Sequence, residues 1–257
     1  MNQYDNLKLL GKGSYGTVYK VQKKNNKKIY ALKELDVKKL KTRYDIKNLI
    51  NELKILCYHD CEYLLKCKDI YYDKKKINIV TNYAKYIDLS HLIEKNKKRG
   101  TRLNEKIIWI IFIKSCYGLE YLHKYNIIHR DLKTANILLS DNCSVWLADF
   151  GVSKILENRI NSFTMIGTPY YVSPEMFNDM NYDKKIDIWA LGCILFELAT
   201  LDVPFKANDM RSLKSKILSG RYYEDCLNIY SNDLKNMIRY LLERNNKIRP
   251  SIENVIN

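Results

Sequence analysis

The chain has 257 residues and 46% of them are hydrophobic, so it can bury a sizeable core and is not a disordered protein. It carries 44 Lys and Arg against 29 Asp and Glu, and the net charge is +15. Because the lysines are scattered, and form no stripe with aromatic residues, they indicate solvated faces and argue against a nucleic-acid-binding protein.

The cysteines and the apolar runs bear on the compartment. Seven cysteines without a C-x-x-C pair favour reduced thiols, an intracellular chain and no zinc site. No apolar run reaches transmembrane length, and the start does not resemble a signal peptide, so we expect no membrane partner. The oligomeric state is not indicated by the sequence.

Alternating polar and apolar residues predict strands in the first part of the chain. Residues 4–35 form strands around the turn "KKNNKK", and residues 64–73 and 76–83 form two more. Between them, residues 42–57 change to a helical period. The apolar residues expected on the packed face of this helix are Ile46, Leu49, Ile50, Leu53, Leu56 and Cys57.

From residue 88 onwards the helical period dominates. The expected helices cover residues 89–97, 104–125, 184–200, 208–219 and 231–243, and a short helix ends the chain. Strands first and helices afterwards predict an α+β arrangement in two lobes. We expect an N-lobe at 1–82, a hinge at 83–87 and a C-lobe at 88–257.

Three glycines form the pattern Gly11-x-Gly13-x-x-Gly16, followed by Val18. The pattern alone is weak, since accidental turns also produce it, and a Rossmann loop would open a helix. Here "TVYKVQ" after Gly16 alternates like a strand, which favours a strand–turn–strand hairpin. Such a hairpin can lie over a triphosphate and offer backbone N–H groups to its oxygens.

A lysine and a glutamate are candidates for one ion pair. Lys33 follows Ala31 at the period of a strand, so both side chains point to the same face. An inward ammonium needs a partner, and Glu52 at the edge of the packed helix face is the candidate. The alternative is that Lys33 and Glu52 are ordinary surface residues.

The segment "IIHRDLKTANILLS" places polar groups between two apolar runs. Asp131 could accept a proton from an attacking hydroxyl, Lys133 could neutralise a γ-phosphate, and Asn136 could bind a divalent cation. Asp149 follows the apolar strand "SVWLA" and could complete a Mg²⁺ site of hard oxygen ligands. Each residue alone could be a satisfied loop polar group, but their order together favours phosphoryl transfer.

Together these residues resemble the eukaryotic protein kinase fold over essentially the whole chain. The fold implied is a small β-rich N-lobe with one main helix and a larger helical C-lobe. The residues that carry the resemblance are Gly11, Gly13, Gly16, Val18, Ala31, Lys33, Glu52, His129, Asp131, Lys133, Asn136, Asp149, Phe150, Gly151, Ser173 and Glu175.

The resemblance implies a role for each site residue. Lys33 holds the α- and β-phosphates of ATP, Asp131 is the catalytic base beside Lys133, and Asn136 and Asp149 bind Mg²⁺. His129 and Phe150 are scaffold, Asp187 braces the catalytic loop, and Arg249 pairs with Glu175. The residues expected around the nucleotide are Gly11, Gly13, Gly16, Val18, Ala31, Lys33, Glu52, Thr81 (the gatekeeper position), Tyr83, Ala84 and Leu138.

Further motifs indicate which hydroxyl group accepts the phosphate and which kinase subfamily the chain resembles. Lys133 and Thr168 are typical of Ser/Thr kinases, so the expected partners are protein substrates with Ser or Thr acceptors. "GTPYYVSPE" and "DIWALGCILFEL" resemble the NIMA-related kinases, which implies roles in the cell cycle and a cytoplasmic, nuclear, centrosomal, spindle or cilium location. The alternatives are a pseudokinase or scaffold of the same fold and a Ste20-like kinase.

Phosphorylation of the segment 152–167 is expected to regulate activity. Thr164 lies where the family is phosphorylated, Ser162 is a rival site, and Arg130 could pair with the phosphate.

Two other residues are expected to be structural, His59 by packing or capping and Trp146 in the core.

Overall fold

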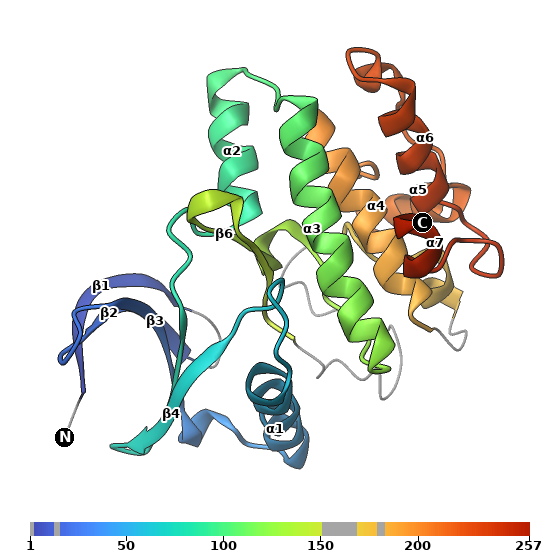
Figure 1. The fold of residues 1–257 in the computed structure, drawn as a ribbon. Coiled ribbons are helices and arrows are strands. Elements are labelled where there is room, and N and C mark those ends of the chain that lie inside the picture. The colour runs from blue at the N-terminus through green and yellow to red at the C-terminus, as the bar shows by residue number, and fades with distance from the viewer. Residues whose placement is uncertain (1–2, 13–15, 151–168, 179–182) are drawn as a thin grey trace.

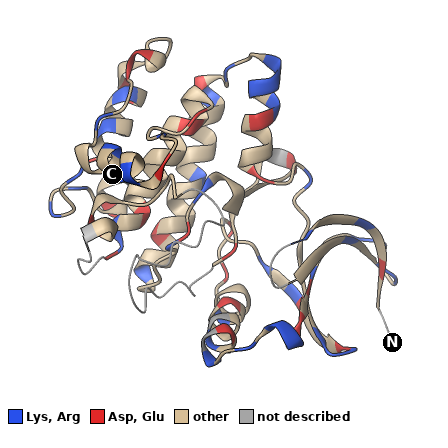
Figure 2. Ribbon diagram, turned by 180° about the vertical axis from the view of Figure 1, so that it is seen from behind, with Lys and Arg blue, Asp and Glu red and all other residues tan. Residues whose placement is uncertain are grey.

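A computed structural model describes residues 3–12, 16–150, 169–178 and 183–257 (Figure 1). A β-sheet lobe is followed by a lobe of helices, as predicted. Lysine and arginine are spread over both lobes (Figure 2). Within the described ranges, no helix has the length and apolar character needed to cross a bilayer.

The N-lobe is built on one antiparallel sheet with the strand order β1-β2-β3-β5-β4. Its strands are β1 (Tyr4–Lys12), β2 (Gly16–Lys23), β3 (Ile29–Asp36), β4 (Cys67–Asp73) and β5 (Lys76–Asn82). Each begins within three residues of the predicted position. Tyr4, Val21, Leu32 and Val80 form a small core on one face of the sheet.

Helix α1 (Arg43–Tyr58) is the one long helix of the described N-lobe. It begins at a capping box, in which the Thr42 hydroxyl accepts from the Asp45 N–H and the Asp45 carboxylate accepts from the Thr42 N–H. This reciprocal pair satisfies two backbone donors and fixes the first turn, from which the later side chains of the helix are positioned.

The predicted packed face of α1 is only half correct. Leu49 and Leu56 are buried, but Ile46 is 48% exposed, Ile50 is 47% exposed, and Cys57 is also exposed. These three residues lie together on a stripe of the helix surface next to the stripe that carries Leu49 and Leu56. The prediction was wrong because the spacing alone does not say how wide a stripe the sheet and the C-lobe cover.

The C-lobe contains six helices among the described residues, with bounds close to those predicted. They are α2 (Leu89–Arg99), α3 (Glu105–Lys124), α4 (Lys185–Thr200), α5 (Met210–Ser219), α6 (Asn232–Leu241) and α7 (Ile252–Ile256). The short hairpin of β6 (Ile137–Leu139) and β7 (Val145–Leu147) lies between α3 and α4 in the chain.

Helix α4 is the centre of the C-lobe core. It is apolar on nearly every side, so it is stable only when other elements surround it. Helices α3 and α6 pack against it (Figure 1), and the ring of Trp189 stacks on that of Phe205 at 5.4 Å between centroids. A helix covered in this way cannot shift without opening the core, so the residues near its first turn have fixed positions.

The two lobes are joined by backbone hydrogen bonds at β7. The Leu65 N–H donates to the Leu147 carbonyl at 2.9 Å, and the Leu147 N–H donates to the Tyr63 carbonyl at 2.9 Å. Tyr63 and Leu65 precede β4, whereas Leu147 comes two residues before Asp149. The pairing therefore brings the end of β7 against the N-lobe.

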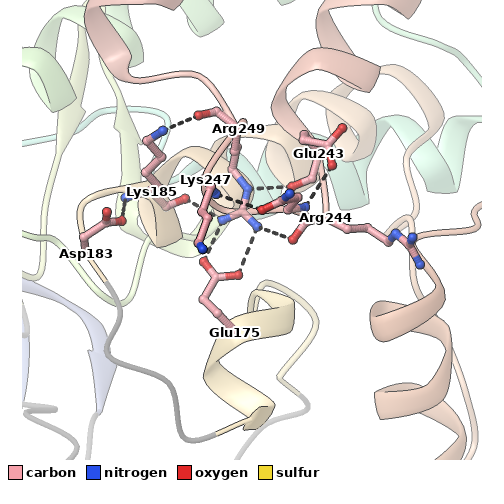
Figure 3. A network of polar contacts seen from close by, with 8 residues as sticks. Glu175, Asp183, Lys185, Glu243, Arg244, Lys247 and Arg249 are labelled. Atoms are coloured by element: carbon pink, nitrogen blue, oxygen red, sulfur yellow. Dashed lines mark hydrogen bonds and ion pairs between the residues drawn. The ribbon is translucent and has the colours of Figure 1, made fainter.

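Arg249 and Glu175 form the buried ion pair that the resemblance implied (Figure 3). Two guanidinium nitrogens donate to the two carboxylate oxygens at 2.7 and 3.0 Å, and neither side chain exceeds 4% exposure. The third guanidinium nitrogen, Nε, donates to the Glu243 carbonyl at 2.7 Å. The guanidinium also lies over the Trp189 ring, 5.1 Å from its centroid. This network attaches the segment at Glu175 to the helical core.

Arg249→Gln should lower the free energy of unfolding by about 3–5 kcal/mol, because it leaves the Glu175 carboxylate buried without its cation. Urea denaturation measures the loss. The matched control is Arg239→Gln, which breaks the exposed pair of Arg239 with Glu224 (2.6 Å) and should lose much less, since water screens that pair. Equal losses in the two variants would contradict the buried network.

Candidate active site

The strands that flank the glycine pattern pair as predicted, because β1 and β2 are antiparallel with Gly11 opposite Val18. The Rossmann alternative is wrong, since a strand follows Gly16. A Cβ on Gly16 would lie 2.2 Å from the Glu34 carbonyl oxygen, so close pairing with β3 requires glycine there. A Cβ on Gly11 would meet nothing within 4 Å. Gly13 lies outside the described residues.

Lys33 and Glu52 form the predicted ion pair, with 2.6 Å between Nζ and Oε1. Their side chains are 33% and 17% exposed, so the surface-residue alternative is wrong. Burial disfavours the charge on Lys33, but the carboxylates of Glu52 and Asp149 outweigh burial and raise the pKa of Lys33. The lysine therefore stays charged near Asp149, which belongs to the other lobe.

The residues predicted around the nucleotide come from three neighbouring segments. Ala31 lies opposite Thr81 in the pairing of β3 with β5. After β5, the segment that contains Tyr83 and the buried Ala84 leads to α2. This segment pairs with β6 through a bridge between Asp88 and Leu138.

The loop before β6 is held by hydrogen bonds to one buried carboxylate. Asp187, 1% exposed, accepts hydrogen bonds from the N–H groups of His129 and Arg130 at 2.9 Å each, and it lies 2.8 Å from the His123 ring. Arg130 has a left-handed backbone with φ of 66°, which costs about 1–2 kcal/mol in a residue with a side chain. The bracing role predicted for Asp187 is confirmed.

Asp131, Lys133 and Asn136 point toward one another. The Lys133 ammonium donates to Asp131 Oδ2 at 2.7 Å. The Asn136 amide nitrogen donates to the Asp131 carbonyl at 2.7 Å and to Oδ2 at 3.2 Å. Because both contacts use Nδ2, the amide oxygen of Asn136 faces away from Asp131.

Asp149 lies next to this group. The Ala148 N–H donates to the Asn136 carbonyl at 2.9 Å, and Asp149 itself has a left-handed backbone with φ of 53°. Phe150 is buried against the His129 ring, with 5.8 Å between centroids. The scaffold role of these two rings is confirmed. The backbone thus holds the exposed Asp149 one residue before a buried ring and one residue after the hydrogen bond to Asn136.

A partly buried chain of hydroxyl groups beside the loop was not predicted from the sequence. The Tyr171 hydroxyl lies 2.9 Å from that of Thr134 and donates to Glu197 Oε2 at 2.5 Å. Burial raises the pKa of Glu197 although both hydroxyls favour its charged form, and burial together with Glu197 raises the pKa of Tyr171. The available signal was a lone glutamate in the apolar run of α4, which needs buried partners.

Of the two residues expected to be structural, His59 lies as predicted and Trp146 does not. His59 ends α1 and packs edge-on against the rings of Tyr121 and Tyr125, as expected. Trp146 is not in the core. It is partly exposed, because it lies opposite Leu138 in the hairpin and shares the less buried face of that strand pair. Ser162, Thr164 and Thr168 lie outside the described residues.

Comparison with known proteins identifies the family. The model of the protein kinase domain matches residues 4–257. The chain therefore belongs to the protein kinase domain family.

Within this family the chain is similar to NIMA-related (Nek) kinases, as the resemblance implied. It is 33% identical over its full length to the probable serine/threonine-protein kinase nek2 of Dictyostelium discoideum and covers 62% of that protein. Over 98% of its length it is 34% identical to the human serine/threonine-protein kinase Nek2, of which it covers 58%. It is 33% identical to mouse Nek1 and covers 21% of it. The chain thus spans less than two thirds of each relative.

The raised pKa of Glu197 predicts a pH dependence of stability. The folded state binds a proton at this group at pH values where the unfolded chain has lost it. The contribution of Glu197 to stability should therefore fall as the pH rises above the ordinary glutamate pKa of 4.5. Glu197→Gln should flatten this slope in urea denaturation measured between about pH 5 and pH 7. Glu94→Gln is the control and should not change it, because Lys98 lowers the pKa of Glu94. An unchanged slope in Glu197→Gln would contradict the assignment.

Proposed function

We propose that the chain is a protein kinase that transfers the γ-phosphoryl group of ATP to Ser or Thr hydroxyls of protein substrates, with Mg²⁺. The single observation that carries the proposal is the convergence of Asp131, Lys133 and Asn136 beside Asp149, with Lys33 near Asp149 and charged. Phosphoryl transfer needs positioning and charge neutralisation more than covalent help, and this set supplies both.

The donor set suits the nucleotide and its metal. The amide oxygen of Asn136 and the carboxylate of Asp149 are the hard ligands that Mg²⁺ prefers. When bound, Mg²⁺ supplies charge neutralisation at the phosphates. Lys33, oriented by Glu52, is suited to hold phosphate oxygens, and the open space around Gly11 suits a close approach of ATP to the hairpin.

Asp131 and Lys133 then have complementary roles. Asp131 orients the acceptor hydroxyl and takes its proton as the new oxygen–phosphorus bond forms, while the bond from the γ-phosphorus to the bridging oxygen breaks and ADP leaves. Lys133, 2.7 Å away, neutralises the negative charge that moves onto the transferred group. The loop is held at Asp187, so these groups are positioned before the substrate arrives.

A Ser/Thr acceptor is favoured by Lys133, which tyrosine kinases lack, and by the names of the relatives. The retained Lys33, Asp131 and Asp149 favour an active kinase over a pseudokinase. The resemblance to NIMA-related kinases also supports a cell-cycle role and a cytoplasmic, centrosomal or cilium-associated location, which we include in the proposal.

Asp131→Asn should lower turnover of a generic Ser/Thr substrate with ATP and Mg²⁺ by about 10²–10⁴-fold, because the amide cannot accept the proton. Asp233→Asn, which changes an exposed aspartate on α6, is the matched control and should stay active. Chelation by EDTA should stop turnover and added Mg²⁺ should restore it. The proposal fails if Asp131→Asn retains full activity or if the wild type does not bind nucleotide.

We also propose that a phosphate on Thr164 pairs with Arg130 and activates the enzyme. A phosphate adds charge of about −1.5 to −2, and arginine can bind it through two N–H groups. Thr164→Ala should therefore abolish the gain in activity that follows phosphorylation, whereas Ser162→Ala should keep it. Activity assays before and after phosphatase treatment measure the gain. If Thr164→Ala still responds to phosphatase like the wild type, the proposal is wrong.

A further inference from the structure

A groove of about 1010 Å³ lies on the C-lobe beside the segment that joins the lobes. Helices α2 and α3 stand side by side along it, and the hairpin of β6 and β7 lies at one end (Figure 1). The Lys114 ammonium of α3 donates to the Cys143 carbonyl at 2.8 Å and fixes the hairpin to the helix. The groove is therefore built on rigid elements.

The floor of the groove is apolar and partly open. Ile107 of α3 is 39% exposed, and Leu92 and Ile110 beside it are partly buried. Leu139 and Val145 close the floor beneath them and are themselves buried. The groove thus offers accessible aliphatic carbon over a packed base.

The groove is separate from the proposed nucleotide site. Side chains alternate along β6, so Leu139 points into the groove while Leu138 points to the opposite face. The Tyr86 N–H donates to the Leu139 carbonyl at 3.1 Å, so the joining segment pairs with β6 beside the groove. None of the described residues expected around the nucleotide lines the groove.

The rim of the groove is basic. Lys85, Lys95, Lys98 and Arg99 line it, against Glu94 as its single carboxylate. Figure 2 shows blue residues at the end of α2 from which two of these cations come. Lys85 pairs with Asp141 at 3.1 Å, and Lys98 pairs with Glu94 at 3.0 Å.

Lys95 and Arg99 remain available for a ligand. Both are exposed, and neither has an ion pair among the residues that the structure describes. They are four positions apart on α2, so their side chains share the face that borders the groove. Two cations beside an aliphatic floor define a ligand that carries both carboxylates and apolar side chains.

We propose that this groove docks a linear segment of a partner protein in which aliphatic residues are flanked by Asp or Glu. An extended peptide can place its apolar side chains on Leu92, Ile107 and Ile110 while its carboxylates reach Lys95 and Arg99. The volume lies at the upper end of small-molecule pockets, about 300–1,000 Å³, and suits several residues of a peptide. A nucleic acid would leave the aliphatic floor without contacts.

The test is direct binding, which does not depend on phosphoryl transfer. The probe is a short fluorescein-labelled peptide whose centre alternates leucine and serine and whose ends carry glutamates. Its partner has the same centre and lysines at the ends. Fluorescence anisotropy should show binding of the acidic peptide only, and added salt should weaken it because the contacts at the rim are exposed ion pairs.

Three variants of the full chain locate the contact. Lys95→Glu combined with Arg99→Glu should weaken binding about tenfold or more, because it reverses the charge of the rim. Ile107→Ser should weaken peptide binding, because it removes an aliphatic side chain from the floor of the groove. Ile107 is partly exposed, so this substitution should leave the fold intact. The matched control, Lys28→Glu with Arg211→Glu, makes the same change in net charge at two exposed sites away from the groove and should bind like the wild type.

Four results would overturn the proposal. They are no binding of the acidic peptide, equal weakening by the control pair, displacement of the peptide by ATP with Mg²⁺, and displacement by a thymidine oligonucleotide at equal concentration. The second would assign binding to the net charge of +15, the third to the nucleotide site, and the fourth to a nucleic-acid surface. Thermal melts of each variant confirm that the protein is folded, and Lys95→Gln with Arg99→Gln replaces the charge reversal if it is not.

Discussion

The organisation of the site depends on the buried carboxylate of Asp187. It contacts the ring of His123 and accepts two N–H groups of the loop that carries Asp131, and α4 fixes it from the other side. Hydrogen bonds to a charged group are strong, and Asp187 is only 1% exposed, which strengthens them further. The carboxylate therefore holds a loop whose backbone at Arg130 is intrinsically unfavourable.

Around this contact, buried and partly buried polar side chains form hydrogen bonds that hold separate segments of the C-lobe together. Arg249 holds Glu175 through two hydrogen bonds, and Tyr171 joins the loop at Thr134 to α4 at Glu197. These side chains have hydrogen-bond partners, which limits the desolvation cost of placing them inside. Asp131 and Lys133 of the proposed site lie at the edge of this interior, where their side chains are partly exposed.

The sequence predicted most of the elements because strands and helices have different periods, and it predicted the pair of Lys33 with Glu52 because an inward ammonium needs a carboxylate. The sequence did not predict the contacts that depend on how the elements pack against one another. The spacing along α1 could not show that Ile46 and Ile50 stay exposed, since the width of the covered stripe is a tertiary property. Likewise, the link from Tyr171 to Glu197 joins residues far apart in the chain, whose meeting no local pattern encodes.

The left-handed backbone at Arg130 and Asp149 has a thermal consequence. Arg130 adjoins Asp131, and Asp149 is itself part of the proposed site. Both residues would relax to an ordinary conformation if their hydrogen-bonded surroundings loosened. Local opening requires less free energy than unfolding of the core around α4. On warming, the alignment of the groups at the proposed site should therefore be lost before the helices of the C-lobe core melt.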